Sequence, residues 1–316
     1  MSVTPQTWIV DSDYTGELRA RQGLAQRLNF PVHTIPRPDA LTRAYLQARL
    51  EHCHDSQPSH IILINGTGEE TTAAVAELAT SLPVPVCSVF LASILPDTPH
   101  PRLWDYHLIA SPQLHGKGII HLPCVPHTMT DARLQHARAR HAADFANLPR
   151  PLTAVLIGGN TRYCFGFDRQ HAHALAARLR QFWQQFGGSL WLSDSRRTPP
   201  EAWQTLLDDL SDLPLSAQHW QHADADHYPA LLAHADYCIV TGDSLSMCSE
   251  ATFTGKPVWV DLTETTTESY HRAIIGNMQH HGLIQPLRPP YHPYHYPRPD
   301  PTEQVAQAVL AYLTSA

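Results

Sequence analysis

The 316-residue sequence lacks the features that would place a protein in a membrane or an oxidising compartment. Its six cysteines lie far apart and include no CxxC pair, a pattern that predicts reduced, mostly buried thiols rather than a disulfide framework. No segment approaches 18 consecutive apolar residues, and no basic stretch precedes an apolar one at the N-terminus. We therefore expect neither a secretion signal nor a membrane span. The sequence predicts a cytoplasmic protein, with a peripheral contact at the inner membrane left open.

Motifs for several common chemistries are also missing. Neither HExxH nor GxSxG occurs, which argues against a zinc protease and against an α/β-hydrolase. The pairs His219/His222 and His292/His295 have no acidic or cysteine partner at a recognised metal spacing, so no metal site is predicted. The net charge of −7 argues against a nucleic-acid partner, which would favour a basic surface.

The sequence does contain short apolar runs that alternate with segments of helical pattern. These runs occupy residues 7–10, 60–66, 84–92, 106–111, 118–123, 153–159, 188–194, 237–242 and 256–261. Strands that alternate with helices of about 10–15 residues indicate βαβ units and parallel sheets.

A domain boundary is expected near residue 150. A helical segment at 131–146 ends at a proline-containing linker, 148–151, and a new strand begins at Thr153. The predicted parts are two doubly wound, Rossmann-like domains at 1–148 and 152–290, followed by a proline-rich crossover and a helix at 291–316 that packs on the first domain. Ligands of open α/β sheets bind beyond the carboxyl ends of the strands, so we expect a cleft between the two domains to hold the site.

The segment 238–260 condenses a strand, a polar turn, a short helix and a second strand into 23 residues. Its turn, Thr241–Ser244, leads to a helix expected to start near Leu245, with Asp243 or Ser244 as the N-cap. Such a helix N-terminus after a strand suits a phosphate.

Ser246 and Glu250 are four residues apart on this helix and share one face. On a face that lines the cleft, Glu250 could accept both hydroxyls of a ribose while Thr241, Ser244 and Ser246 meet the diphosphate. The alternative is an ordinary capped helix with Glu250 in solvent.

Two further loops follow strands of the second half. Gly158, Gly159 and Asn160 end the run 153–159, and glycines at this place let a phosphate or sugar approach the backbone closely. Arg196 and Arg197 follow the next run and suit the neutralisation of a diphosphate. An ion pair of one arginine across the domains is the competing interpretation.

The sequence also predicts the helix that follows these arginines, with Thr198 as N-cap and Pro199 at the first helical position. In the first half, Asp13 and Glu17 lie near the start of a helix that follows the strand 7–10. A carboxylate at this edge is a candidate catalytic base.

The blocks "VLIGG", "SRRTPP" and "DSLSMCSEATFTGKPV", together with "PCVPHTMTDARL" before the linker, resemble the plant mitochondrial-fission family and its bacterial homologues. That family is similar in turn to GT-B glycosyltransferases, including the enzyme that adds N-acetylglucosamine to lipid I. The resemblance implies a GT-B fold and a metal-independent transfer from a nucleotide-sugar donor, with no further cofactor. It also implies Glu250 as the ribose ligand, Ser244 and Ser246 at the diphosphate, and an acceptor that could be linked to lipid or to the cell envelope.

One part of the family pattern is absent. The family's first loop usually reads Gly-His-x-Asn-Gln, and the aligned positions here are Gly16, Glu17, Arg19 and Ala20. Catalysis would therefore use Glu17 or Asp13 as the base. A non-catalytic adaptor or regulator with the same fold, and an epimerase of nucleotide sugars, are the alternative functions.

Overall fold

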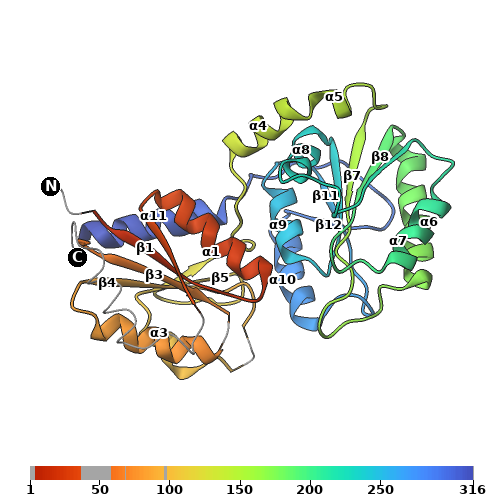
Figure 1. Cartoon of the computed structure of the whole chain (residues 1–316). Coiled ribbons are helices and arrows are strands. Elements are labelled where there is room, and N and C mark those ends of the chain that lie inside the picture. Colours follow the sequence, from red (N-terminus) through yellow and green to blue (C-terminus); the bar gives the residue numbers. More distant parts are fainter. Residues whose placement is uncertain (1–3, 37–57, 68, 96–97, 316) are drawn as a thin grey trace. The chain divides into compact units, whose positions relative to one another are not determined.

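The computed structural model describes residues 4–36, 58–67, 69–95 and 98–315, which fold into two compact units (Figure 1). Unit 1 comprises Met1–Thr128 and Asp300–Ala316, and unit 2 comprises Met129–Pro299. Each unit contains one six-stranded sheet, in which all neighbouring strands are parallel. Two doubly wound α/β units were the fold expected from the alternation of strands and helices.

Unit 1 is a sheet with helices on both faces (Figure 1). Its strand order is β2-β1-β3-β4-β5-β6. In chain order its elements are β1 (Gln6–Val10), α1 (Thr15–Leu28), β2 (Val32–Ile35), β3 (Ile61–Gly66), α3 (Glu69–Ser81), β4 (Val86–Leu91), the 3₁₀ turn η2 (Pro101–Asp105), β5 (Leu108–Ser111), β6 (Ile119–His121) and α11 (Pro301–Ser315).

The apolar run of β3 shows why this sheet is covered on both sides. Ile61 and Leu63 belong to the core cluster beneath α3, whereas Ile62 and Ile64 belong to the cluster beneath α1 and α11. Successive side chains of a strand point to opposite faces. Four consecutive apolar residues, 61–64, therefore require helices on both faces of the sheet. Each such isoleucine contributes about 1.5–3 kcal/mol when it leaves water.

The last helix, α11, returns the chain to unit 1, where it packs against α1. Arg27 on α1 forms ion pairs with Asp300 at 2.9 Å and with Glu303 at 3.0 Å. The Thr302 hydroxyl accepts a hydrogen bond from the His127 backbone N–H at 2.9 Å. Unit 2 ends at Pro299, and the residues from Asp300 onward belong to unit 1. None of the described helices is long and apolar enough to cross a membrane.

Unit 2 has the strand order β12-β11-β10-β7-β8-β9. Its elements are α4 (Asp131–Arg140), α5 (Ala142–Phe145), β7 (Leu152–Leu156), α6 (Arg169–Phe186), β8 (Ser189–Ser193), α7 (Pro200–Asp209), β9 (Leu215–Gln218), α8 (His227–His234), β10 (Tyr237–Thr241), α9 (Leu245–Thr252), β11 (Val258–Asp261), α10 (Ser269–His280) and β12 (Gln285–Pro286).

The boundary between the units falls before α4 rather than at the linker 148–151. Helix α4 packs against α8 of unit 2, and the Arg138 guanidinium donates a hydrogen bond to the Ala233 carbonyl at 2.9 Å. The single helix expected at 131–146 is divided at His141, whose backbone is non-helical with φ −104° and ψ 18°. Contacts with α8 therefore place both short helices in unit 2.

Three strands were not among the apolar runs: β2, β9 and β12. Each is an edge strand of its sheet, and each is only partly buried. Edge strands are short and carry polar residues because one side of their backbone has no strand partner. Their sequences therefore give a weak apolar pattern.

Candidate functional site

The site residues predicted in the second half lie at the point where the strand order of unit 2 reverses. The chain passes from β7 outward to β8 and β9, and returns to β10 on the other side of β7. The loops that follow β7 and β10 therefore diverge from adjacent carboxyl ends, which is where doubly wound sheets bind ligands.

Gly158 joins the three loops at this edge. Its backbone N–H donates a hydrogen bond to the Thr241 hydroxyl, at the end of β10, at 2.8 Å. Its carbonyl accepts one from the Thr198 hydroxyl at 2.8 Å and a second from the Ser195 hydroxyl. The ends of β7, β8 and β10 are thus tied together through one peptide backbone.

The close approach of these loops requires glycine at 158 and 159. A Cβ on Gly158 would lie 2.0 Å from Asp243 Oδ2. Gly159 has φ +123°, and a Cβ there would lie 2.2 Å from the Arg197 carbonyl oxygen. Only glycine adopts such a backbone without strain and leaves room for the neighbouring chain.

The two predicted arginines have different surroundings. The Arg197 guanidinium lies 2.7 Å from the carboxylate of the buried Asp243 and donates a hydrogen bond to the Asn160 carbonyl at 3.2 Å. Burial raises the pKa of Asp243, and Arg197 opposes that rise. Arg196 is exposed. An arginine ion pair does form, as the competing interpretation held, but it lies within unit 2.

Helix α9 begins at Leu245, as expected, with Ser244 as its N-cap. Ser244 has an extended backbone, but its side chain makes no capping hydrogen bond to the first turn. Asp243, the other predicted cap, instead pairs with Arg197. The N-terminus of α9 therefore carries its partial positive charge without a carboxylate cap.

Glu250 lies inside unit 2 and is only 2% exposed. The Tyr228 hydroxyl, at the start of α8, donates a hydrogen bond to Glu250 Oε2 at 2.8 Å. Ser246, one helical turn earlier, is half-buried. The interpretation of Glu250 as a solvated surface residue is therefore wrong, because its carboxylate is held within the fold.

The predicted cap at Thr198 is also wrong. Helix α7 begins at Pro200 with Pro199 in the N-cap position. The Thr198 hydroxyl is engaged by the Gly158 carbonyl and receives a hydrogen bond from the Ser195 backbone N–H at 3.0 Å. Thr198 therefore joins the loops after β7 and β8 instead of capping α7.

Sequence reasoning missed a second polar group beside the glycine loop. The Thr161 hydroxyl donates a hydrogen bond to the Glu268 carboxylate, at the N-terminus of α10. His271, one turn into α10, is 9% exposed. Burial lowers its pKa to about 4, with Glu268 opposing that change and Arg197 adding to it. Only the spacing of Glu268 and His271 along one helix could have indicated this group.

The candidate bases in the first half, Asp13 and Glu17, belong to unit 1. Asp13 is exposed in the turn before α1, and Glu17 is buried in its first turn. Burial raises the pKa of Glu17, whereas the Arg21 charge and hydrogen bonds from Ser93 and Thr67 lower it. Glu17 is therefore part of the packed interior of unit 1.

Each unit is a doubly wound sheet of parallel strands, and the chain is similar in fold to GT-B proteins. The UDP-GlcNAc 2-epimerase of Methanocaldococcus jannaschii is similar in structure, with a TM-score of 0.55 and 13% identity over 98% of this chain and 100% of that one. Another structure of that epimerase, which holds UDP-GlcNAc and UDP, has a TM-score of 0.50 and 12% identity, with 98% and 100% covered. MurG of Acinetobacter baumannii has a TM-score of 0.51 and 10% identity over 98% of this chain and 90% of that one.

The chain belongs to the mitochondrial fission ELM1 family, whose model matches residues 15–313. The mitochondrial fission protein ELM1 of Arabidopsis thaliana is 34% identical over 137 residues, which are 42% of this chain and 31% of that protein. An uncharacterized protein of Rickettsia prowazekii (strain Madrid E) is 30% identical over 130 residues, 41% of this chain and 36% of that protein. The matched stretches thus span about a third of these relatives.

Proposed function

We propose that unit 2 binds the nucleotide diphosphate of a nucleotide-sugar donor at the loops after β7, β8 and β10, and that the protein is a glycosyltransferase. The observation that carries the proposal is the glycine backbone at 158–159, set beside Arg197 and the N-terminus of α9 at the strand-order reversal. The epimerase structure with UDP-GlcNAc and UDP supports this choice of ligand class.

Each part of the edge has a distinct role in this proposal. The N–H groups that open α9, together with Ser244 and Ser246, bind the diphosphate, because a helix N-terminus favours an anion. Arg196 adds a positive charge to that of the α9 N-terminus. The charge of Arg197 is offset by Asp243, which lies 2.7 Å away. Gly158, Gly159 and Asn160 face the donor sugar.

Glu250 is the ribose ligand. A carboxylate has about four acceptor positions, of which one on Glu250 accepts the hydrogen bond from Tyr228. Glu250 is almost wholly buried, and the hydrogen bond from Tyr228 fixes the position of its carboxylate.

The binding test uses isothermal titration with UDP, GDP, CMP and their sugars on the full chain. Hydrogen bonds to a charged group contribute about 1.5–3 kcal/mol, so Glu250→Gln is expected to weaken nucleotide binding by at least tenfold. Glu201→Gln, an exposed carboxylate in the first turn of α7, is the matched control and keeps wild-type affinity. The donor proposal fails if no nucleotide binds, or if Glu250→Gln binds as tightly as the wild type.

In this proposal Arg196 and the α9 N-terminus neutralise the diphosphate charge, and a divalent cation is not part of the donor site. Added Mg²⁺ is therefore expected to leave the dissociation constant of UDP within twofold. A strong dependence on Mg²⁺ would contradict this part of the proposal.

A non-catalytic adaptor or regulator is the second candidate function, and the position of Glu17 favours it. Glu17 is packed against Arg21, Thr67 and Ser93, and the histidine of the family's first loop is absent. Nucleotide binding without sugar transfer to any added acceptor would select this function. Conversion of the donor sugar without an acceptor would instead select an epimerase. The acceptor, its link to lipid or envelope, and a peripheral contact with the inner membrane stay predictions.

A further inference from the structure

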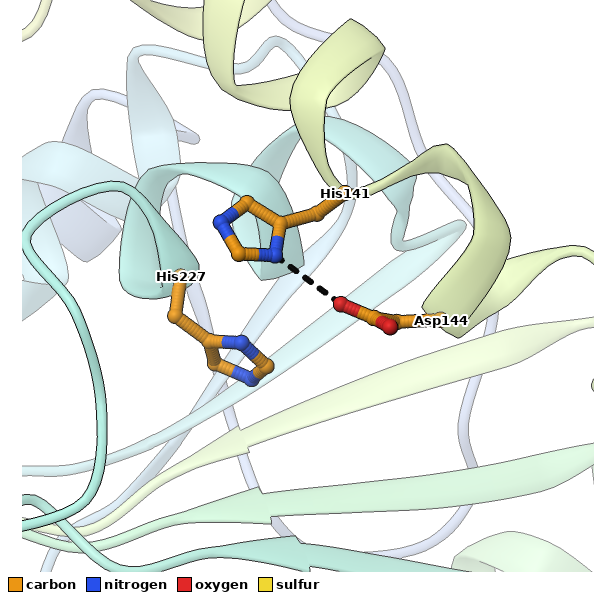
Figure 2. Close-up of side chains that lie close together, drawn as sticks. All are labelled: His141, Asp144 and His227. Carbon is orange, nitrogen blue, oxygen red and sulfur yellow. Dashed lines mark hydrogen bonds and ion pairs between the residues drawn. The ribbon is translucent and has the colours of Figure 1, made fainter.

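Three side chains of unit 2 converge where α4 and α5 meet the start of α8. They are His141, Asp144 and His227, and Figure 2 shows them facing one another from these elements. One ligand atom of each lies within 4.8 Å of the other two. His141 Nδ1 is 2.9 Å from Asp144 Oδ2. The break between α4 and α5 falls at His141 itself, so this residue leaves the helical path at the cluster.

His227 is buried without a full set of hydrogen-bond partners. The residue is 7% exposed, and its Nε2 has no hydrogen-bond partner among the described residues. A buried imidazole nitrogen without a hydrogen-bond partner is available to bind a metal ion.

A fourth residue, Asp224, orients the cluster from outside. Its Oδ1 lies 3.2 Å from His141 Nε2, on the opposite side of the ring from Asp144. The same carboxylate accepts hydrogen bonds from the backbone N–H groups of Asp226 at 3.0 Å and His227 at 2.9 Å, and pairs with Arg140 at 3.1 Å. A metal-binding histidine commonly has a carboxylate at its other ring nitrogen, and Asp224 occupies this position.

We infer that His141, Asp144 and His227 form a binding site for a divalent transition-metal ion of the Zn²⁺ class. Two imidazole nitrogens and one carboxylate oxygen suit Zn²⁺, whereas Ca²⁺ and Mg²⁺ prefer oxygen ligands alone. The Asp144 side chain is 49% exposed, so water would supply the fourth ligand of a bound ion. The ion would join the α4–α5 segment to α8. This inference is independent of the proposed donor site.

Sequence reasoning predicted no metal site because it considered histidine pairs close in the chain. The pairs at 219/222 and 292/295 lacked acidic partners. Here one histidine comes from the start of α8 and the other from the junction of α4 and α5. Only tertiary packing brings the second imidazole to the His141/Asp144 pair.

The test is a titration of the chelator-treated, dialysed full chain with Zn²⁺ by calorimetry, repeated with Co²⁺ by visible absorption. One saturable Zn²⁺ site and the strong visible bands of a tetrahedral Co²⁺ complex are expected. His227→Gln and Asp144→Asn should each lose at least tenfold in affinity and lose the bands. Asp224→Asn should lose about 10- to 100-fold, as expected for a carboxylate behind a metal ligand.

The matched control is His173→Gln, because His173 also pairs with one carboxylate, Asp209, at 2.6 Å, but the described residues place no second histidine in a metal-binding group with it. It should keep wild-type affinity and spectrum. Since Asp144 is half exposed, Asp144→Asn is expected to fold normally, and its melting curve without metal checks this. Equal Zn²⁺ affinity in wild type, His227→Gln and Asp144→Asn would overturn the inference, as would equal losses in His173→Gln.

Discussion

Both units have an arginine and a buried carboxylate at the point where the strand order reverses, but the arginines come from different elements. In unit 1, Arg21 lies on α1, the helix that follows β1, and its guanidinium donates hydrogen bonds to the carbonyls of Val10, Asp11 and Thr67. It thus joins the ends of β1 and β3. In unit 2, the corresponding ends of β7 and β10 are joined by the backbone N–H of Gly158 and the Thr241 hydroxyl.

The difference concerns which groups join the strand ends. In unit 1 a buried, long side chain fills the edge and uses its donors on the protein's own carbonyls. In unit 2 the edge is built from glycine backbone, and the arginine that reaches it, Arg197, pairs with Asp243 from the side. The same topology therefore joins the strand ends through a long side chain in one unit and through glycine backbone in the other.

The largest expected effect comes from a methyl group at the backbone-lined edge. Gly159→Ala forces φ +123° on an alanine and places its Cβ against the Arg197 carbonyl. Backbone strain and overpacking together should lower the free energy of unfolding of unit 2 by roughly 3–5 kcal/mol. Urea unfolding followed by tryptophan fluorescence measures this, because unit 2 holds Trp183, Trp191, Trp203, Trp220 and Trp259.

Gly276→Ala is the control for that change. Gly276 lies in α10, and a Cβ there meets nothing within 4 Å. Alanine should stabilise this helix by about 0.5–1 kcal/mol. If the two alanine variants are equally stable, the edge is not packed as described.

The next effect is the acid sensitivity of unit 2 through His271. Its pKa in the folded chain is about 4, below the 6.5 of a free histidine. The unfolded chain thus binds the proton first, and stability is lost as pH falls from about 6.5 to 4. At about 1.4 kcal/mol per pKa unit, the loss is about 3–3.5 kcal/mol. His271→Asn should lack this component in urea unfolding curves across that range; an unchanged slope against pH would contradict the burial of a neutral imidazole.

Unit 1 should respond to pH in the opposite direction through Glu17. Burial raises the pKa of this carboxyl, so the folded state favours its neutral form and this contribution to stability is lost as pH rises through the folded pKa. Relative to the wild type, Glu17→Gln should therefore gain roughly 1 kcal/mol between acid and neutral pH. Hydrogen exchange of the β3 amides measures it within unit 1. An advantage of Glu17→Gln that shrinks with rising pH would reverse the assignment.

The smallest effect is expected where α11 meets α1. Arg27 pairs with Asp300 and Glu303 at a partly exposed contact, so Arg27→Met should cost about 0.5–1 kcal/mol, and less at high salt. Thermal unfolding at two salt concentrations measures this. Arg180→Met in unit 2, which removes an exposed pair with Asp212, should change stability less; a larger loss there would show that exposure does not decide these contributions.

Much of the fold could be predicted from the sequence because its central strands consist mostly of apolar residues. Ile61–Gly66 and Leu152–Leu156 are buried along their whole length, and that burial requires helices on both faces. The glycines after β7 and the start of α9 were also predicted correctly, because turns and helix starts depend on local backbone chemistry. The edge strands and the break at His141 were not, since neither depends on an apolar period.

The sequence by itself determined the two doubly wound units, the glycine loop and the helix on which Glu250 lies, because local pattern and burial decide those features. Only the tertiary structure decided the partners of the charged groups. Asp243 could have capped α9 or paired with an arginine, and Glu250 could have faced solvent or the interior. Those choices depend on which loops meet at the reversal of the strand order. Likewise, His227 lies near His141 and Asp144 only because α8 packs against α4.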